Sequence, residues 1–226
     1  MSLLQVEGLD VGIQGSGIDL LREVSFDVRP GEIHGLVGES GSGKTMASLA
    51  VMGLLPPGIE YRSGSVRIED EELAGSNGVR RASGRMAMIF QHPRSALNPT
   101  MRVGRQIARV LRLQQGLDRA EAVDAAQDML TRVGIPGAQR VAKAYPHQLS
   151  GGMCQRVMIA MALACKPRLL IADEPTTALD VTIQAQIFDL IRELVEETGC
   201  GVLFITHDLA AVAEMCDRVT VLYGGQ

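Results

Sequence analysis

The sequence lacks the features of a secreted, membrane-spanning or metal-binding chain. Its four cysteines form no C-x-x-C pair and have no metal-ligand spacing, so buried free thiols in a reducing cytosol are expected at Cys154, Cys165, Cys200 and Cys216. No apolar run approaches the ~20 residues that a membrane-spanning helix needs. The opening residues, MSLLQVEGLD, reach acidic side chains at once and do not have the pattern of a signal peptide. Any association with a membrane is therefore expected to be peripheral.

The sequence also lacks an excess of positive charge. It has 22 Lys and Arg against 26 Asp and Glu, which gives a net charge of −4 at pH 7. This balance argues against a broad nucleic-acid-binding surface and leaves room only for a local basic patch. The 226 residues, of which 46% are apolar, suit one large globular domain or a domain with an inserted subdomain. Neither an internal repeat nor a low-complexity segment is present.

Hydrophobic periodicity predicts strands at the beginning of the chain and helices in the middle. Strands are expected over residues 2–13, 20–28, 33–38, 63–70 and 85–90. The second of them alternates as a half-buried antiparallel strand does, and a helix is expected to begin at Lys44. Between about 101 and 148, amphipathic stretches separated by Gly and Pro indicate an inserted helical subdomain.

The last third of the chain alternates between helix and strand. The expected elements are an apolar helix over 153–165, a strand over 168–174, a helix over 180–197, a strand over 201–207, a short helix and a strand over 218–223. Such alternation predicts a mainly parallel central sheet flanked by helices. Ligands of such sheets bind at the carboxyl ends of the strands, which is where the motifs below are found.

A glycine-rich loop connects the predicted strand over 33–38 to the helix at Lys44. Its sequence, GESGSGKT, fits the phosphate-loop pattern G-x-x-x-x-G-K-[ST]. Gly38, Gly41 and Gly43 let the backbone wrap round a phosphate chain, and Lys44 can reach the β- and γ-phosphates. Thr45 offers a hydroxyl to Mg²⁺. The alternative is a glycine-rich turn that Lys and Thr follow by chance.

Two adjacent carboxylates, Asp173 and Glu174, end the buried strand in LLIADEP. A carboxylate in that position is unfavourable unless a metal or hydrogen bonds compensate it. Asp173 is therefore a candidate for the magnesium shell, and Glu174 a candidate general base for an attacking water. In the alternative interpretation Asp173 caps the next turn and Glu174 is solvated.

Gln91 and His207 each end a predicted strand. An amide at Gln91 could contact Mg²⁺ or the water and report to the helical insert, and an imidazole at His207 could donate to the γ-phosphate. A lone Gln or His at a strand end is more often structural, so only the shared sheet edge favours the functional interpretation. His34, His92 and His147 lack that context and are expected to be structural.

A second glycine turn, LSGGMCQR at 149–156, leads directly into an apolar helix. Ser150 can cap that helix, and the glycines leave backbone N–H groups open to an anion. The residues alone leave both interpretations open, a simple cap and a second phosphate contact.

These elements, in this order, resemble the nucleotide-binding domain of ABC transporters over essentially the whole chain. GESGSGKT resembles the Walker A loop, FQHP the Q-loop, LSGGMCQR the signature motif, LLIADEP Walker B with its catalytic glutamate, TALD the D-loop and ITHD the switch histidine. HPRSALNP, YPHQLSGGM and IADEPTTALDVTIQAQI are similar to the dipeptide, oligopeptide and nickel importer subfamily.

The resemblance implies a P-loop NTPase fold with an N-terminal antiparallel β part and an inserted helical subdomain. One nucleotide-binding domain is expected over 1–226, with 1–91 and 151–226 in the RecA-like core and 92–150 in the helical subdomain with the signature motif. The implied ATP-binding residues are Gly38, Ser40, Gly41, Ser42, Gly43, Lys44, Thr45 and Met46, with Ile18 near the adenine. The implied Mg²⁺ ligands are Thr45, Gln91 and Asp173, the catalytic residues are Glu174, His207 and Gln91, and Asp180 belongs to the D-loop.

In the family, two such domains dimerise head to tail, and each ATP lies between the Walker A loop of one and the signature of the other. Ser150, Gly151 and Gly152 are then expected to contact the nucleotide of a partner, either a second copy or a related ATPase. The other implied partners are membrane permease subunits and, indirectly, a substrate-binding protein, with no nucleic acid. The expected location is peripheral, on the cytoplasmic face of the inner membrane.

The sequence departs from the family pattern at three places. Ile18 stands where an aromatic residue often stacks on adenine, which predicts apolar packing instead. Cys154 replaces the usual polar residue inside the signature. The sequence ends at YGGQ, where subfamily members usually continue, so a domain of a longer or tandem protein is expected.

The function implied is an ATPase that powers import of peptides, or nickel, through a permease. A non-transport ATPase of the same fold, acting as a clamp on DNA or ribosomes, is the main alternative; the compact insert and the acidic balance argue against it. A small-molecule kinase or GTPase would leave LSGGMCQR as a coincidence, and the chain has no N-K-x-D guanine-reading motif.

Overall fold

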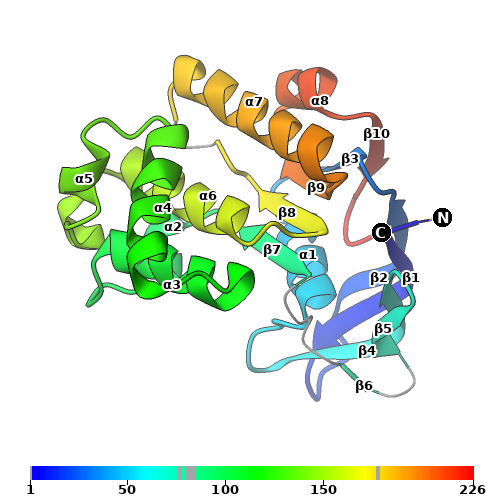
Figure 1. The fold of residues 1–226 in the computed structure, drawn as a ribbon. Helices are drawn as coiled ribbons and strands as arrows, with labels where there is room; N and C mark the ends of the chain where they lie inside the picture. Colours follow the sequence, from blue (N-terminus) through cyan, green and yellow to red (C-terminus); the bar gives the residue numbers. More distant parts are fainter. Residues whose placement is uncertain (1, 76–77, 80–84, 177–178) are drawn as a thin grey trace. The chain divides into compact units, whose positions relative to one another are not determined.

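The computed structural model describes residues 2–75, 78–79, 85–176 and 179–226 (Figure 1). The chain divides into two compact units, each of which is described by itself. The first unit comprises Met1–Met86, Arg168–Asp173 and Gly199–Gln226, and the second comprises Ala87–Pro167 and Glu174–Thr198.

The first unit contains an antiparallel sheet with the strand order β2-β1-β4-β5-β6. Its strands are β1 (Leu4–Ile13), β2 (Asp19–Val28), β4 (Ile59–Ile68), β5 (Glu71–Gly75) and β6 (Gly78–Val79). Val6 of β1 pairs with Phe26 of β2 on one side and with Val66 of β4 on the other, and all three side chains are buried. The predicted alternation of β2 is confirmed, because its apolar side chains pack inward while the polar ones face solvent.

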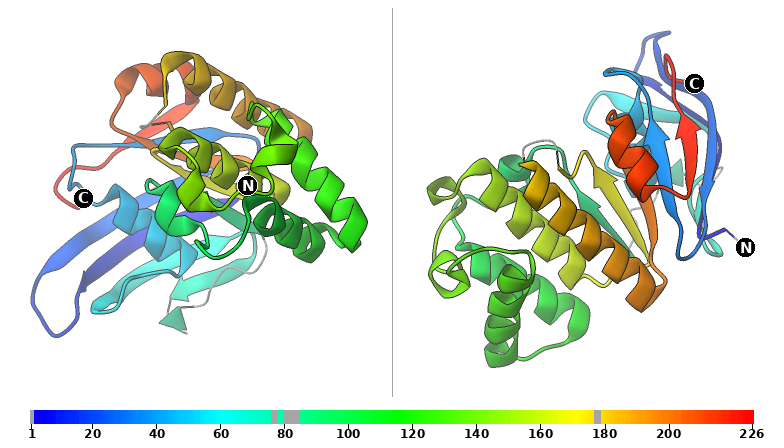
Figure 2. Two further views of the ribbon diagram at one scale, coloured as in Figure 1. Left: turned by 90° about the vertical axis from the view of Figure 1, so that its left-hand side faces the viewer. Right: turned by 90° about the horizontal axis from the view of Figure 1, so that it is seen from above.

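A parallel sheet forms the other layer of the first unit. Its strands are β3 (Ile33–Val37), β8 (Leu169–Asp173), β9 (Gly201–Thr206) and β10 (Arg218–Val221), in the order β10-β3-β9-β8. Every residue of β3, β8 and β9 is buried, as expected of parallel strands that are covered on both faces. The helices of this unit are α1 (Lys44–Met52), which contacts β2 and β8, and α8 (Leu209–Met215), which packs on β9 (Figure 2).

The second unit is mainly helical. It begins inside β7 (Met86–Ile89) and contains α2 (Pro93–Ala96), α3 (Val103–Gln115), α4 (Arg119–Arg132), α5 (Ala138–Val141), the 3-10 turn η1 (Pro146–Gln148), α6 (Gly151–Ala164) and α7 (Val181–Thr198). Helices α3 and α4 lie side by side, and both contact α6 (Figures 1 and 2). Their buried side chains, such as Ile107 and Leu111 of α3 and Ala126 and Leu130 of α4, recur four residues apart on one face of each helix.

The structure confirms the predicted helices and strands and adds the short helix α2 and the strands β5 and β6, which the sequence analysis did not predict. Strand β5 has the sequence EELAG, too short and too polar for a periodic signal, and it forms by pairing with β4. Strand β4 also begins at Ile59, four residues before the predicted start. The domain boundaries inferred from the family resemblance remain a prediction.

The four cysteines are free thiols. Cys154 and Cys200 are buried, whereas Cys165 and Cys216 are only half-buried, which corrects the expectation of four buried thiols. Burial raises the pKa of Cys200 to about 12 and that of Cys216 to about 11, so these thiols are protonated at neutral pH.

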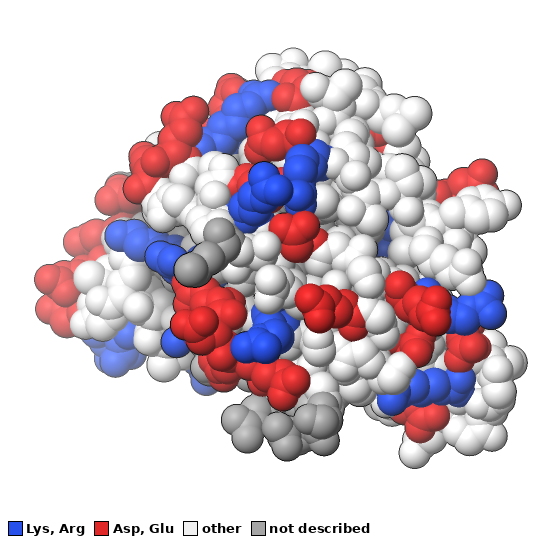
Figure 3. Space-filling view, turned by 90° about the vertical axis from the view of Figure 1, so that its right-hand side faces the viewer, with Lys and Arg blue, Asp and Glu red and all other residues white. Residues whose placement is uncertain are grey.

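Charged side chains of both signs are interspersed on the face drawn in Figure 3, and its coloured residues form no broad basic patch. None of the helices in the described residues has the length and hydrophobicity needed to cross a bilayer.

Candidate functional site

The glycine-rich loop joins the end of β3 to the first residue of α1. Lys44 is only 6% exposed, and its ammonium turns back over the loop. Its Nζ donates to the carbonyl oxygens of Gly38 and Glu39, both at 2.8 Å, and lies 3.4 Å from Ser42 Oγ. The lysine therefore holds the loop in a closed curve and places one positive charge within it.

At two glycines of the loop a side chain would clash with neighbouring atoms or strain the backbone. A Cβ at Gly38 would collide with the carbonyl oxygen of Leu222 and would lie 2.6 Å from Ser42 Oγ. Gly43 has φ of 102°, and a Cβ there would lie 2.5 Å from Leu21 Cδ2. Gly43 also leaves the first turn of α1 without a side-chain cap, so the N–H groups of that turn are suited to an anion.

Three adjacent parallel strands of the first unit end at this edge of the sheet. The register pairs Val37 of β3 with Thr206 of β9, and Ile205 of β9 with Asp173 of β8. The phosphate-loop sequence and His207 therefore follow two of these strands, and Asp173 is the last residue of the third, at one edge of the sheet as predicted. Asp173 is 2% exposed, deep enough that its charge requires compensation.

His207 lies on the exposed turn between β9 and α8, and both of its neighbours fix that turn. Thr206 Oγ1 accepts a hydrogen bond from the Asp208 amide at 3.0 Å. The Asp208 carboxylate in turn accepts from the Ala210 amide at 2.9 Å and caps α8. The backbone is thereby held on both sides of the imidazole.

In the second unit the structure brings together Gln91 and Glu174, which are 83 residues apart. Gln91 Nε2 donates to Glu174 Oε2 at 2.9 Å. Glu174 is half-buried, so part of its surface is in contact with solvent, and its role as a base remains a prediction. Its backbone has φ of 47°, a conformation that costs a non-glycine residue about 1–3 kcal/mol.

Ser150 is the N-cap of α6, and its Oγ accepts a hydrogen bond from the Met153 amide at 3.2 Å. The capping interpretation is thus confirmed, while the contact with an anion remains a prediction. Ser150 is exposed, Gly151 and Gly152 are partly exposed, and a Cβ at Gly151 would meet nothing within 4 Å. The first turn of α6 is therefore open to solvent.

The family model for the ABC transporter matches residues 21–177. The chain belongs to the ABC transporter family. It is 49% identical to the glutathione import ATP-binding protein GsiA of Escherichia coli (strain K12), over 100% of this chain and 38% of that protein. It is also 49% identical to GsiA of Salmonella paratyphi A (strain ATCC 9150 / SARB42), over 99% of this chain. The chain thus spans only 38% of the length of these curated relatives.

Solved ABC structures share the fold. An ATP-binding subunit of an ABC transporter superposes with a TM-score of 0.81 at 28% identity and covers 99% of this chain and 87% of its own. The ATP-binding cassette MJ0796, solved as a dimer bound to ADP and Pi, superposes with a TM-score of 0.84 at 27% identity and covers 98% of this chain and 95% of its own. The predicted ABC family and its α/β P-loop fold, with a parallel and an antiparallel sheet, are therefore confirmed.

The other predicted residues of this ABC cassette differ in their exposure to solvent. Asp180 precedes α7, and its Oδ1 accepts a hydrogen bond from the Ile183 amide at 3.1 Å. Residues 177 and 178 of the D-loop lie outside the described residues. Ser40 and Thr45 are exposed, Met46 is half-buried and Ser42 is buried.

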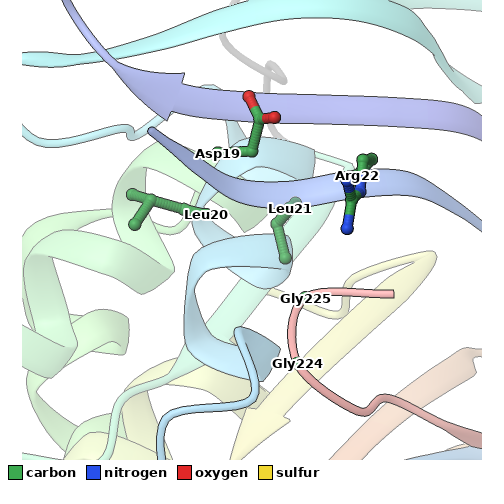
Figure 4. A pocket seen from close by; sticks show the side chains of 6 residues that line it. All are labelled: Asp19, Leu20, Leu21, Arg22, Gly224 and Gly225. Carbon is green, nitrogen blue, oxygen red and sulfur yellow. The ribbon is translucent and has the colours of Figure 1, made fainter. Parts of the chain in front are cut away.

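Ile18 is 56% exposed, in the turn between β1 and β2. A pocket of about 220 Å³ begins one residue later (Figure 4). It is lined by Asp19, Leu20, Leu21 and Arg22 of β2 and by Gly224 and Gly225 of the loop after β10. Gly225 N donates to the phosphate-loop carbonyl of Ser42 at 3.1 Å, so the pocket borders that loop. Ile18 does not line it.

Gln155 of α6 was missed by the sequence analysis. This amide is 2% exposed, and its Nε2 donates to the carbonyl oxygen of Pro175 at 2.7 Å. The available signal was a polar side chain inside the otherwise apolar helix MCQRVMIAMALAC. Nothing local indicated that its partner would be the residue after Glu174.

Proposed function

We propose that this chain is the ATP-binding and ATP-hydrolysing cassette of an ABC importer that transports peptides, or nickel. The observation that carries the proposal is that the phosphate loop, Asp173 and His207 lie at the carboxyl ends of three adjacent parallel strands of one sheet. The similarity to proteins named for glutathione import, a small peptide, supports the choice of cargo class. The same similarity favours transport over a DNA or ribosome clamp.

The phosphates of ATP are assigned to the loop at the start of α1. Lys44 supplies the charge that faces the β- and γ-phosphates, and the exposed Gly41 lets backbone N–H groups approach them. Ser40, Ser42 and Met46 contribute further backbone N–H groups, and Gly38 and Gly43 allow the close curve. The adenine is assigned to the neighbourhood of Ile18.

The residues assigned to Mg²⁺ have the chemistry that the ion requires. Mg²⁺ takes oxygen ligands and usually binds through one or two carboxylates together with substrate phosphates. Asp173 supplies a carboxylate and Thr45 an exposed hydroxyl on the first turn of α1. Gln91 directs its Nε2 to Glu174, so Oε1 is the atom of this amide suited to the ion. The bound ion would neutralise phosphate charge.

Glu174 is the proposed general base. In hydrolysis the water oxygen forms a bond to the γ-phosphorus, and the bond between the γ-phosphorus and the bridging oxygen breaks, so that ADP leaves. The proton of the water passes to the base. The hydrogen bond from Gln91 fixes the direction of the carboxylate. His207 is assigned as a donor to the γ-phosphate.

The cassette is proposed to act as a dimer with a second copy or a related ATPase. Ser150, Gly151 and Gly152 would contact the nucleotide of the partner, and Asp180 would take part in the dimer contact. The open first turn of α6 supports this assignment, as do the dimeric structures of a related cassette.

A permease subunit is the proposed partner of the helical unit, and we assign its docking site to a groove between α3 and α4. This groove has a volume of about 610 Å³ and is lined by Met101, Arg105, Ala108, Arg109, Arg112, Leu113, Leu117, Arg119 and Val123. Leu113 is 73% exposed and Val123 is 47% exposed, beside four arginines that form no ion pair with the described residues. An acidic segment with apolar side chains fits such a surface.

The proposed location is peripheral, at the cytoplasmic face of the inner membrane, with a substrate-binding protein as an indirect partner and no nucleic acid. We retain residues 92–150 as the helical subdomain and residues 1–91 and 151–226 as the RecA-like core. These boundaries follow the motifs rather than the compact units.

Glu174→Gln in the full-length protein tests the proposal. The carboxamide keeps the shape of the side chain but accepts no proton, so we expect ATP turnover to fall by roughly 10²–10⁴-fold. ATP binding, measured by equilibrium titration, should be unchanged. Glu196→Gln on the exposed face of α7 makes the same chemical change elsewhere in the unit and should leave turnover intact. Turnover by Glu174→Gln at the parent rate would contradict the proposal.

A further inference from the structure

Gln155 is a buried polar side chain in a helix that is otherwise packed by apolar ones. It lies on the second turn of α6, five residues after the N-cap Ser150, and its neighbours Cys154, Val157 and Met158 are buried. Its amide donates to the Pro175 carbonyl at 2.7 Å. A helix rises 1.5 Å per residue, so this hydrogen bond lies roughly 7 Å along α6 from the exposed first turn.

The carbonyl that Gln155 holds belongs to the residue directly after Glu174. Pro175 is buried and has no N–H, so this oxygen is the hydrogen-bonding group that its backbone offers. Glu174 itself has a left-handed φ of 47°, and a following proline restricts the preceding residue further. Such a backbone persists only where surrounding contacts hold it.

Two glutamine amides therefore fix Glu174 from opposite ends. Gln91 holds the carboxylate at 2.9 Å, and Gln155 holds the backbone one residue further along the chain. Both bonds lie within the second unit. Of the two glutamines, Gln155 alone belongs to α6, the helix whose N-cap is Ser150.

We propose that Gln155 is a positioning residue that ties the direction of the Glu174 carboxylate to helix α6. A displacement of the first turn of α6, where Ser150 would meet the partner's nucleotide, then reaches the base through one rigid helix and one buried hydrogen bond. The inference rests on the proposed role of Glu174 as general base. Gln155 touches no reacting atom and acts only through the backbone at Pro175.

The test compares two buried glutamines of the second unit in the full-length protein. Gln155→Met keeps the length of the side chain and removes the donor. Gln106→Met is the matched control, because Gln106 is also buried and its Nε2 donates to the backbone oxygens of Asn98 and Met101, at 3.0 and 2.8 Å. Both variants should lower the melting temperature, since each leaves backbone carbonyls without their donor.

The two variants should differ in turnover. For Gln155→Met we expect kcat to fall about tenfold or more, because a small misplacement of a catalytic group is enough for such a loss. Its KM for ATP should stay within about twofold, since the phosphate loop is untouched. Gln106→Met should keep the parent kcat. Equal kcat values for Gln155→Met and the parent would overturn the inference.

The pH dependence of kcat in the variant Gln155→Glu is a further test, because it would not change if Gln155 had only a structural role. A protonated carboxyl at this position can still donate to the Pro175 carbonyl, whereas a carboxylate repels it. The kcat of this variant, divided by that of the parent, should therefore fall as the pH rises through the pKa of the new buried carboxyl. A flat ratio overturns the inference, and this profile decides alone if Gln155→Met does not fold.

A double-mutant cycle separates this inference from the proposed function. In a Glu174→Gln background, single-turnover hydrolysis should be insensitive to Gln155→Met, because the group that Gln155 positions is already lost. An equal loss in both backgrounds would overturn the inference while the function stands. If the parent protein does not hydrolyse ATP, the function itself is wrong and the inference falls with it.

Discussion

Substituting Ser150 separates its structural role from its proposed contact with a nucleotide. Ser150 Oγ caps α6 through one hydrogen bond, to the Met153 amide at 3.2 Å. Alanine removes this acceptor without adding charge. Aspartate keeps an acceptor at the N-cap and adds one negative charge at the same exposed position.

The two substitutions should change stability in opposite directions. Loss of an N-cap acceptor lowers the free energy of unfolding by about 1 kcal/mol, so Ser150→Ala is expected to be less stable by that amount. The first turn of α6 has no acidic residue. Ser150→Asp therefore retains the cap and gains about 0.3–1 kcal/mol from the helix dipole. The expected order of stability is Asp, then Ser, then Ala.

Turnover should follow a different order if the first turn of α6 meets a phosphate. At about 4 Å and an effective dielectric constant of about 20, two unit charges of the same sign repel by roughly 4 kcal/mol. Since about 1.4 kcal/mol corresponds to a factor of ten, Ser150→Asp should lose about a thousandfold in turnover. Ser150→Ala should lose far less, because it introduces no charge. The most stable variant is thus expected to be the least active.

The assay is steady-state ATP hydrolysis by the full-length protein, alongside urea unfolding of each variant. Asp118→Ala serves as the control, because Asp118 caps α4 in the same unit through the Ala120 and Glu121 amides, at 2.7 and 2.9 Å. It should lower stability and leave turnover unchanged. If Ser150→Asp hydrolyses ATP at the parent rate, Ser150 is only a cap and the proposed site in trans is refuted.

Two further predictions concern the groove and a buried histidine. Arg109→Glu combined with Arg112→Glu should reduce the amount of permease recovered with the tagged full-length protein and leave its basal ATPase activity unchanged. The control, Lys166→Glu outside the groove, should change neither quantity. Equal recovery of permease with the parent, the double variant and the control would refute docking in the groove. Burial lowers the pKa of His34 against the opposing effect of the Glu32 carboxylate, and the charge of Arg218 acts in the same direction as burial. The unfolded chain therefore takes up the proton more readily than the folded one. The free energy of unfolding should therefore fall as the pH drops below about 6.5, and urea unfolding of His34→Gln at about pH 5.5 and 7.5 should show a smaller fall.

The phosphate loop could be predicted from the sequence because its chemistry is local. Gly38, Gly43 and Lys44 stand at fixed spacings between a continuous apolar strand and a helix, and the structure has the loop at that place. The strands β3, β8 and β9 could be predicted for a similar reason, since strands buried on both faces are apolar throughout. The order of the motifs was enough to indicate the family.

Strand β5 and the pairing of Gln91 with Glu174 could not be predicted in this way. Strand β5 exists because Ala74 pairs with Val66 and Glu71 with Ile68, so its signal lies in β4 and not in EELAG itself. Gln91 and Glu174 meet across 83 residues, and no local pattern encodes such a contact.

Helix α6 has some features that could be predicted from the sequence and one contact that could not. The sequence LSGGMCQR and the residues after it were enough to predict the N-cap serine, the glycine turn and the apolar length of the helix, because these are properties of neighbouring residues. The hydrogen bond from Gln155 to the Pro175 carbonyl could not be predicted from the sequence, because it forms only when packing brings together two segments 20 residues apart. Spacing along the chain specifies which groups a helix or loop presents, whereas long-range packing selects the partner of each buried polar atom.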